Sequence, residues 1–191
     1  MENNSPKLIT VYTESNPNPN SMKFVVDFML MPDGENLDFA SPSEALVSPL
    51  ASELFKFNFV QRVFVSANFV TITKDIVADW NDLIPILKPY IKGFFEEGKA
   101  LLNEVKNKEV VENEPEIDSK IKMLLDEYVR PAVEQDGGAI TFHSFENGIV
   151  KVTLRGSCSG CPSSTVTLKA GIENLLKRMI PEVQEVVAEG V

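Results

Sequence analysis

The chain has 191 residues, 43% of them apolar, and its 18 Lys and Arg are outnumbered by 28 Asp and Glu, which gives a net charge of −10. This length allows one large domain or two small ones, and the acidic balance argues against binding to nucleic-acid phosphates or anionic lipids. The longest unbroken apolar run, Phe28 to Met31, is far shorter than a membrane-spanning helix requires. We therefore expect a globular protein with no nucleic acid and no membrane among its partners.

Residues 1–20 guide the expected location. They lack the basic start and apolar stretch of a secretion signal, and they lack the Arg-rich, acid-poor composition of an organelle transit peptide. The chain contains only two cysteines, Cys158 and Cys161, which excludes the disulfide framework of a small secreted protein. These observations predict a cytoplasmic location.

An acidic segment divides the chain. Residues 96–115 contain six Glu, three Lys and no aromatic residue, a composition typical of a solvated linker. We therefore predict an amino-terminal domain over residues 1–95, the linker over 96–115, and a carboxy-terminal domain over 116–191.

In the first domain, runs of alternating apolar residues predict strands, and runs with helical periodicity predict helices. The predicted elements, in chain order, are strands at 8–13 and 22–29, a helix at 43–56, a hairpin of strands at 60–66 and 69–74, and a helix from Trp80 to Phe95 capped by Asp79. Together they predict a small α+β domain.

Two details of this domain carry specific expectations. The helix at 43–56 should turn Ala45, Leu46, Leu50 and Leu54 inward, and Trp80 should lie in the core. The segment from Asn16 to Asn20 alternates Asn with Pro and cannot be helical. It is either a rigid connector between strands or a loop that recognises a partner.

The second domain begins with a helix that ends at Asp136-Gly137-Gly138 and places Ile117, Ile121, Leu124, Leu125 and Tyr128 on one face. The glycines either stop the helix or allow close approach of the backbone to the cysteine loop. The remaining predicted elements are strands at 139–146 and 149–155 around Asn147-Gly148, a helix at about 163–180 with Met179 on its apolar face, and a strand at 183–187. The order αββαβ is that of a small α+β domain.

The two cysteines lie three positions apart in a loop that runs from the second of these strands into the following helix, where Pro162 suits the first helical turn. A CxxC loop at a helix N-terminus meets unpaired N–H groups and the positive end of the helix dipole, which lower the pKa of a thiol. This position predicts that Cys158 and Cys161 act as metal ligands or as nucleophiles.

The number of ligands decides what the pair can hold. Two thiolates do not complete a tetrahedral site, and the chain offers one histidine, His143, and no third cysteine. Two copies of the loop across a two-fold axis would supply four thiolates, which suit a [4Fe-4S] cluster, a [2Fe-2S] cluster or one zinc ion.

Two other classes of protein also use cysteine pairs. A thiol-disulfide oxidoreductase also places C-x-x-C before a helix, but here only one helix and one short strand follow the motif, which leaves no room for the rest of that fold. A structural zinc protein bridged across a dimer is chemically allowed, because four thiolates suit zinc as well as iron. The residues alone leave the zinc protein open.

The segment Gly156 to Thr165, together with Asp136-Gly137-Gly138, Thr167-Leu168-Lys169 and Pro181-Glu182-Val183, resembles the NifU-type carboxy-terminal domain. The resemblance covers residues 116–191. The first domain resembles the amino-terminal domain of Nfu proteins through weaker motifs, namely Asn16 to Phe24, Ser48-Pro49-Leu50, Phe64, Thr71 to Lys74 and Asp79-Trp80.

This resemblance implies an iron-sulfur cluster carrier and not an enzyme. It implies a cluster, [4Fe-4S] ahead of [2Fe-2S], bound by Cys158 and Cys161 of two subunits in a homodimer. An upstream cluster scaffold would be the donor and apo iron-sulfur proteins the acceptors. Because the chain lacks the scaffold domain and extra cysteines of full-length NifU, the resemblance does not imply assembly of clusters de novo.

Overall fold

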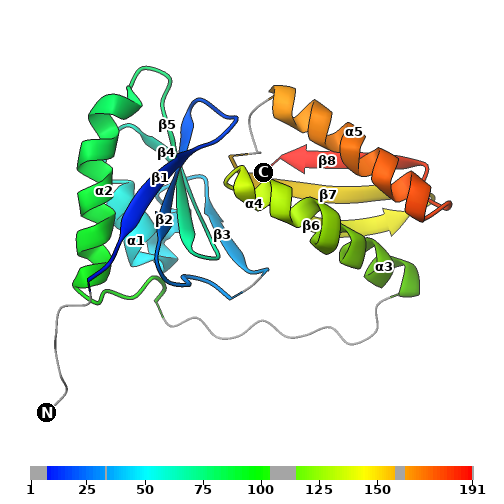
Figure 1. Ribbon diagram of the computed structural model, residues 1–191, viewed down its shortest axis with the longest axis horizontal. Helices are drawn as coiled ribbons and strands as arrows, with labels where there is room; N and C mark the ends of the chain where they lie inside the picture. The colour runs from blue at the N-terminus through cyan, green and yellow to red at the C-terminus, as the bar shows by residue number, and fades with distance from the viewer. Residues whose placement is uncertain (1–7, 33, 104–114, 158–161, 191) are drawn as a thin grey trace, which may run out of the picture. The chain divides into compact units, whose positions relative to one another are not determined.

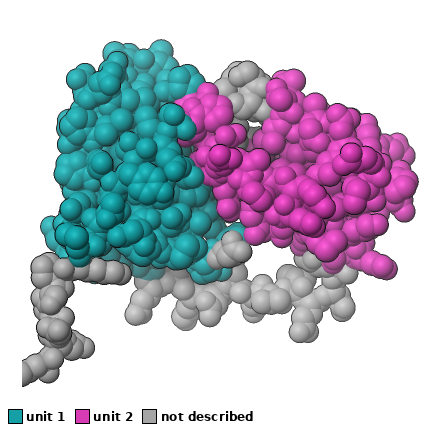
Figure 2. All heavy atoms as spheres, in the orientation of Figure 1, with its two compact units in different colours: residues 1–15, 19–106 teal, residues 16–18, 107–191 magenta. Residues whose placement is uncertain are grey.

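The structure is a computed structural model that describes residues 8–32, 34–103, 115–157 and 162–190, without the side chains of 162–165 and 190. The chain divides into two compact units, which Figure 2 shows in different colours. The first comprises Met1–Ser15 with Pro19–Lys106, and the second comprises Asn16–Asn18 with Asn107–Val191.

The first unit is a five-stranded antiparallel sheet with its helices on one face (Figure 1). The strand order is β1-β2-β5-β4-β3, and the predicted hairpin of β4 and β5 is confirmed, with Ala67 in the left-handed region at a φ of 42°. The strands are β1 (Val11–Ser15), β2 (Ser21–Val26), β3 (Asn36–Phe39), β4 (Val60–Ser66) and β5 (Phe69–Lys74).

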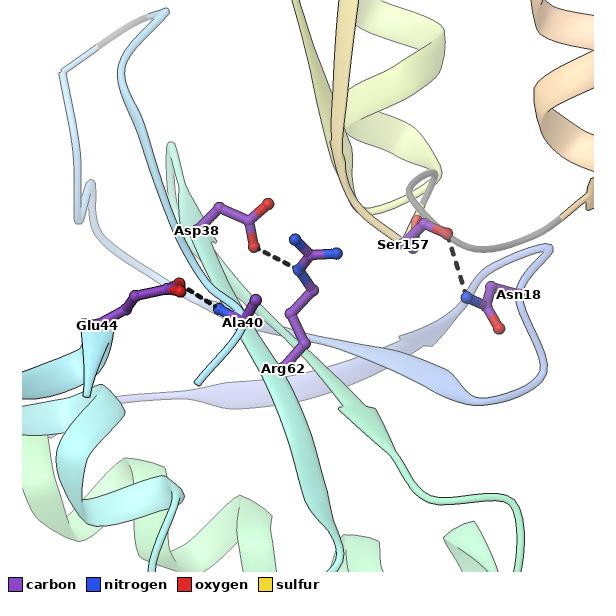
Figure 3. A network of polar contacts seen from close by, with 6 residues as sticks. All are labelled: Asn18, Asp38, Ala40, Glu44, Arg62 and Ser157. Carbon is purple, nitrogen blue, oxygen red and sulfur yellow. Dashed lines mark hydrogen bonds and ion pairs between the residues drawn. The ribbon is translucent and has the colours of Figure 1, made fainter. Parts of the chain in front are cut away.

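Strand β3 lies at the edge of this sheet, and the sequence analysis did not predict it. It pairs with β4, and Arg62 on β4 donates from Nε to Asp38 Oδ1 on β3 over 2.8 Å. The backbone N–H of Ala40 then donates to Glu44 at 2.8 Å, which ties the end of β3 to the next helical turn (Figure 3). A long-range ion pair and a side-chain cap therefore support an edge strand of only four residues.

The predicted helix at 43–56 is wrong, because the chain forms a 3₁₀ helix, η1 (Glu44–Val47), and then α1 (Pro49–Leu54). Ser48 lies between them in an extended conformation, as the residue before a proline prefers, and its hydroxyl caps α1 by accepting from the Ala51 N–H over 3.3 Å. The break turns Leu46 outward, where it is 70% exposed.

Helix α2 (Trp80–Glu96) is confirmed, and its first turn is capped by Asp79, which accepts from the Asn81 N–H at 2.7 Å. Pro85 and Pro89 both lie on its exposed side, where water can satisfy the carbonyls that lose a helical partner. Trp80 packs against the core, as expected, but at its edge, where the side chain is only half-buried. Its indole N–H donates to the Pro19 carbonyl at 3.0 Å, and this polar atom keeps part of the ring at the surface.

After α2, the chain returns to η1 and α1. The Ser48 hydroxyl donates to the Leu101 carbonyl at 2.8 Å, and Asn103 donates from its backbone to Val47 at 2.9 Å and from its side chain to Leu46 at 3.0 Å. We call residues 99–103 the return segment. It falls inside the predicted linker 96–115, whose boundaries stay a prediction and whose residues 104–114 lie outside the described residues.

The second unit has the predicted order αββαβ, and with the first unit it confirms the α+β class. Its sheet has the order β6-β7-β8, with β6 and β7 antiparallel and β8 parallel to β7. The elements are α3 (Glu116–Leu124), the π-helical turn η2 (Leu125–Val129), α4 (Arg130–Gln135), β6 (Gly138–Glu146), β7 (Ile149–Gly156), α5 (Pro162–Met179) and β8 (Glu185–Gly190).

The π-helical turn η2 joins α3 and α4 and has a cause in the sequence. Pro131 has no N–H, and in a regular helix its ring would meet the carbonyl four residues earlier. The wider turn avoids this arrangement, with the Arg130 N–H bonded to the Leu125 carbonyl five residues back. The extra residue rotates Tyr128 outward to 53% exposure, so that its predicted place on the apolar face is wrong.

One buried face of the sheet forms the core of the second unit. Along β7, Val150, Val152 and Leu154 are buried and their neighbours are half-buried, the alternation expected of a strand with one covered face. Ile121 of α3 and Leu176 of α5 pack into the same cluster, so the helices cover this face. At the end of α5, Met179 is exposed, so its predicted place on the apolar face is wrong, and Ile180 is buried instead.

In the described ranges, no helix combines the length and apolar character needed to cross a membrane.

Glu173 fastens α5 to β8. Its carboxylate accepts from the Val186 N–H of β8 at 3.1 Å and from Lys177 Nζ at 2.5 Å. The hydrogen bond from Lys177, and then that from Val186, lower the pKa of Glu173 below its ordinary value.

A group whose pKa is lowered by folding adds stability that is present above its unfolded pKa and is lost as the pH falls through its folded pKa. Glu173→Gln should keep an oxygen for Val186 but lose the charge. We expect urea unfolding of the apo-protein to show this variant less stable than wild type at neutral pH. The difference should close as the pH falls below about 4. A difference that stayed constant down to pH 3 would show that the charge of Glu173 has no such effect.

Candidate functional site

The predicted site residues, Cys158 and Cys161, lie outside the described residues, and their role stays a prediction. Their place in the chain is defined by the elements on either side. Strand β7 ends at Gly156, Ser157 is described, and α5 begins at Pro162. The connection between a strand and a helix that the sequence predicted is therefore confirmed, with Pro162 as the first residue of the helix.

Helix α5 gives this end of the connection its electrostatic character. It runs for 18 residues, has no acidic residue in its first turn, and carries Lys177 and Arg178 in its last turn. The N-terminus of this long helix follows Cys161 in the sequence. The positive end of the helix dipole lies there and favours anions. A thiolate at this end would be stabilised relative to a thiol.

At the other end of the connection, two glycines pair across the sheet. Gly156 closes β7 at a φ of +70°, and its partner in the register with β6 is Gly138. A side chain at position 156 would be strained in this left-handed conformation. The glycine thus allows the strand to turn sharply into Ser157.

Ser157 is tied to the end of the preceding helix. It is only 2% exposed, its N–H donates to the Gly137 carbonyl at 3.3 Å, and its hydroxyl donates to the Asp136 carbonyl. Gly137 has a φ of +77° and donates to the Glu134 carbonyl at 3.0 Å, as a helix stop does. The interpretation of Gly137-Gly138 as a helix stop therefore holds. These glycines also meet the backbone of Gly156 and Ser157. Their approach to the cysteines stays a prediction, because residues 158–161 lie outside the described residues.

The carbonyl of Ser157 is also bonded. Within the second unit, which includes residues 16–18, Asn18 Nδ2 donates to this oxygen over 3.2 Å (Figure 3). The N–H, the hydroxyl and the carbonyl of Ser157 thus all have hydrogen-bond partners.

Other possible ligands are sparse. In the ranges that the structure describes, no group of three or more His, Cys, Asp or Glu side chains is placed to hold a metal ion. His143 is exposed, and its Nδ1 lies 3.5 Å from the hydroxyl of the neighbouring Ser144. The two thiols that the sequence predicts as ligands are soft donors, which fit a soft metal or an iron-sulfur cluster.

The sequence analysis placed Asp136 at the end of a helix and Ser157 within a motif, but it gave neither residue a role at the cysteine loop. A small polar residue between Gly156 and a cysteine was the available signal, since a buried hydroxyl requires partners. The acceptor of this hydroxyl, Asp136, lies 21 residues earlier in the chain, and no local pattern specifies such a pairing.

Comparison with known families identifies both parts of the chain. Residues 121–187 match the family described as the NifU-like domain, and residues 11–98 match the family described as scaffold protein Nfu/NifU N terminal. The two small α+β units therefore correspond to an Nfu N-terminal domain and a NifU-like domain. In the second of them the cysteine pair precedes helix α5 in the sequence. Both domains are present in this chain.

Curated relatives agree with this assignment of the two domains. A protein of Drosophila willistoni, named "NFU1 iron-sulfur cluster scaffold homolog, mitochondrial", is 42% identical over 179 residues, covering 92% of this chain and 62% of the relative. The protein of the same name from Drosophila ananassae is 43% identical, with 92% and 63% covered. The chain thus spans less than two thirds of the length of these relatives.

A solution structure of a NifU-like protein from Saccharomyces cerevisiae aligns at a TM-score of 0.48 and 22% identity, covering 55% of this chain and 93% of that one.

The expected cytoplasmic location is wrong. The relatives from Drosophila willistoni, Drosophila persimilis and Drosophila virilis are all named mitochondrial. The expectation rested on the composition of residues 1–20, which is a weaker guide to location than relatives at this level of identity.

Proposed function

We propose that this protein takes part in iron-sulfur cluster assembly as a cluster carrier, with Cys158 and Cys161 as the ligands that the chain supplies. The observation that carries the proposal is the cysteine pair between β7 and the N-terminus of α5 in a NifU-like domain. A helix end that favours thiolates suits a bound cluster. The names of the relatives, which describe an iron-sulfur cluster scaffold, agree with this role.

The cluster is the cargo and is shared between two subunits in the proposed loaded form. One chain has two cysteines, and a [4Fe-4S] or [2Fe-2S] cluster takes about four thiolates. We propose a homodimer with a [4Fe-4S] cluster bound across its two-fold axis. Coordination divided between two chains would open when the subunits separate, which suits a cluster that is to be passed on.

The partners follow from this role. We propose apo iron-sulfur proteins as acceptors and an upstream scaffold as the donor, with no turnover chemistry by the protein itself. We also propose a mitochondrial location, on the names of the relatives. We propose residues 1–95 and 116–191 as the domains for this work, joined by 96–115, with the return segment of that linker bonded to the first domain.

Anaerobic reconstitution with iron and sulfide tests the function. We expect a brown protein with about four iron and four sulfide per two chains, because a cubane cluster has that composition. Light scattering should show mainly monomer before loading and dimer after it, and a chelator should reverse the change. About two iron and two sulfide per dimer would instead indicate a [2Fe-2S] cluster.

Three outcomes would contradict the proposal. Zinc retained alone after reconstitution would indicate a structural zinc protein. A dithiol that cycles with disulfide substrates and binds no iron would indicate an oxidoreductase. A loaded protein that remained monomeric would require external thiols such as glutathione to complete the ligand set, and would refute the shared cluster.

A further inference from the structure

Ser157 forms hydrogen bonds through its N–H, its hydroxyl and its carbonyl. It is a polar residue with 2% of its surface exposed, and both of its donors reach carbonyls of the turn that follows α4. The hydroxyl reaches Asp136 and the N–H reaches Gly137, which are consecutive residues. Buried polar groups are generally paired in this way, but two bonds to adjacent peptide groups also restrict geometry.

The two acceptors are well placed for this restriction. A helix ends with carbonyls that have no partner within the helix, and Asp136 is the C-cap residue of α4. Gly137 is held at a φ of +77°, and it donates to the Glu134 carbonyl. Both acceptor carbonyls therefore belong to the backbone of a hydrogen-bonded turn and not to a side chain.

Two bonds restrict Ser157 more than one would. A single bond from the N–H would leave the residue free to rotate about that contact. The second bond, from the hydroxyl, fixes the side-chain rotamer and with it the orientation of the Ser157 backbone. Gly156, at a φ of +70°, supplies the turn that brings Ser157 to these acceptors.

We propose that Ser157 is a positioning residue for cluster binding, whose hydrogen bonds to the turn at Asp136 and Gly137 fix the direction in which the chain enters the cysteine pair. This proposal rests on the proposed function, because Cys158 is the next residue and would be the first ligand. The preorganised entry reduces the entropy lost when the thiolate binds the cluster. Ser157 itself donates no ligand.

Three full-chain variants test this role. Ser157→Ala removes the hydroxyl donor but leaves both thiols, and Ser157→Thr restores a hydroxyl. Ser52→Ala is the matched control, because it removes a serine hydroxyl that donates to a helical carbonyl, that of Ala45 at 2.7 Å, in the first unit. All are reconstituted with iron and sulfide, and cluster loss to an excess of chelator is followed by visible absorption and visible circular dichroism.

We expect Ser157→Ala to lose its cluster about tenfold faster than wild type, which corresponds to the loss of one buried hydrogen bond. Its visible circular dichroism should change, because that signal reports the orientation of the ligands. Ser157→Thr should recover most of the wild-type rate, and Ser52→Ala should match wild type in both measurements. Thiol titration of the apo-proteins should give two thiols per chain throughout.

Two results would overturn the positioning role while the function stands. One is that wild type takes up the cluster and Ser157→Ala then loses it at the wild-type rate, with an unchanged visible circular dichroism. The other is a faster loss that is fully explained by the fraction of unfolded protein, measured by urea denaturation of the apo-variant, with an unchanged dichroism of the loaded form. A wild type that takes up no cluster would refute the proposed function and the positioning role together.

Discussion

Cys158→Ser and Cys161→Ser, each in the full chain, are expected to retain less than about a tenth of the iron and sulfide of the reconstituted wild type. Each substitution removes one thiolate from each of two subunits and leaves two of the four that a cluster takes. A serine hydroxyl is a harder ligand and is protonated at neutral pH, so it does not replace a thiolate. Iron and acid-labile sulfide are measured per chain, together with the visible spectrum.

His143→Ala is the matched control for this experiment. It removes the only histidine of the chain, which is exposed, and it should leave the iron and sulfide content unchanged. A loss of cluster in His143→Ala would show that the imidazole is a ligand and that the four-thiolate site is wrong. Full loading of either cysteine variant would remove that cysteine from the proposed ligand set.

The second large effect is expected from Leu154→Ala, which should destabilise the second unit by about 2–5 kcal/mol. Leu154 is fully buried on β7, the middle strand of the second sheet. It lies on the face of that sheet against which the helices of the second unit pack. The truncation loses the free energy gained by burying the removed side-chain atoms, and it leaves a cavity. Small domains are stable by only about 5–15 kcal/mol in total, so this loss should be a large fraction of the stability.

The single tryptophan makes the effect separable by unit. Trp80 lies in the first unit, so its fluorescence reports the unfolding of that unit, whereas far-ultraviolet circular dichroism reports both. In urea, Leu154→Ala should shift the dichroism transition and leave the fluorescence transition in place. Leu50→Ala, at a fully buried position in the first unit, should shift the fluorescence transition. A shift of the fluorescence by Leu154→Ala would show that the two cores do not unfold independently.

Elements specified by local chemistry were predicted well. Asn147 and Gly148 have φ angles of 52° and 81°, which only a few residue types adopt readily, and their hairpin was predicted from this pair. The alternation on β7 and the apolar stripe of α2 are likewise set by the period of each element. These signals lie within a few residues of what they determine.

Elements that depend on distant partners were missed or misplaced. The four-residue strand β3 depends on its pairing with β4 and on the Arg62–Asp38 ion pair. The break at Ser48 and the outward position of Tyr128 have local causes in Pro49 and Pro131, but the helical period was given more weight than the prolines.

In the candidate site, too, the features set by local sequence were predicted and those that depend on distant residues were not. Cysteine spacing and the start of a helix are local, and they allowed Cys158 and Cys161 to be proposed as ligands before any fold was known. The bond from Ser157 to Asp136 joins positions 21 residues apart, and it exists only because β6 and β7 pair with Gly138 opposite Gly156. A sequence pattern gives no register of this kind between separate elements.

The return segment decides where the first domain can be cut for study in isolation. A fragment that ended at Phe95 would leave the fully buried hydroxyl of Ser48 without its acceptor on Leu101, and would uncover the apolar surface that Leu101 covers. It would also free the carbonyls of Leu46 and Val47 from Asn103. Expression fragments of this domain should therefore extend through Asn103, and limited proteolysis should spare the peptide bonds that this segment contains.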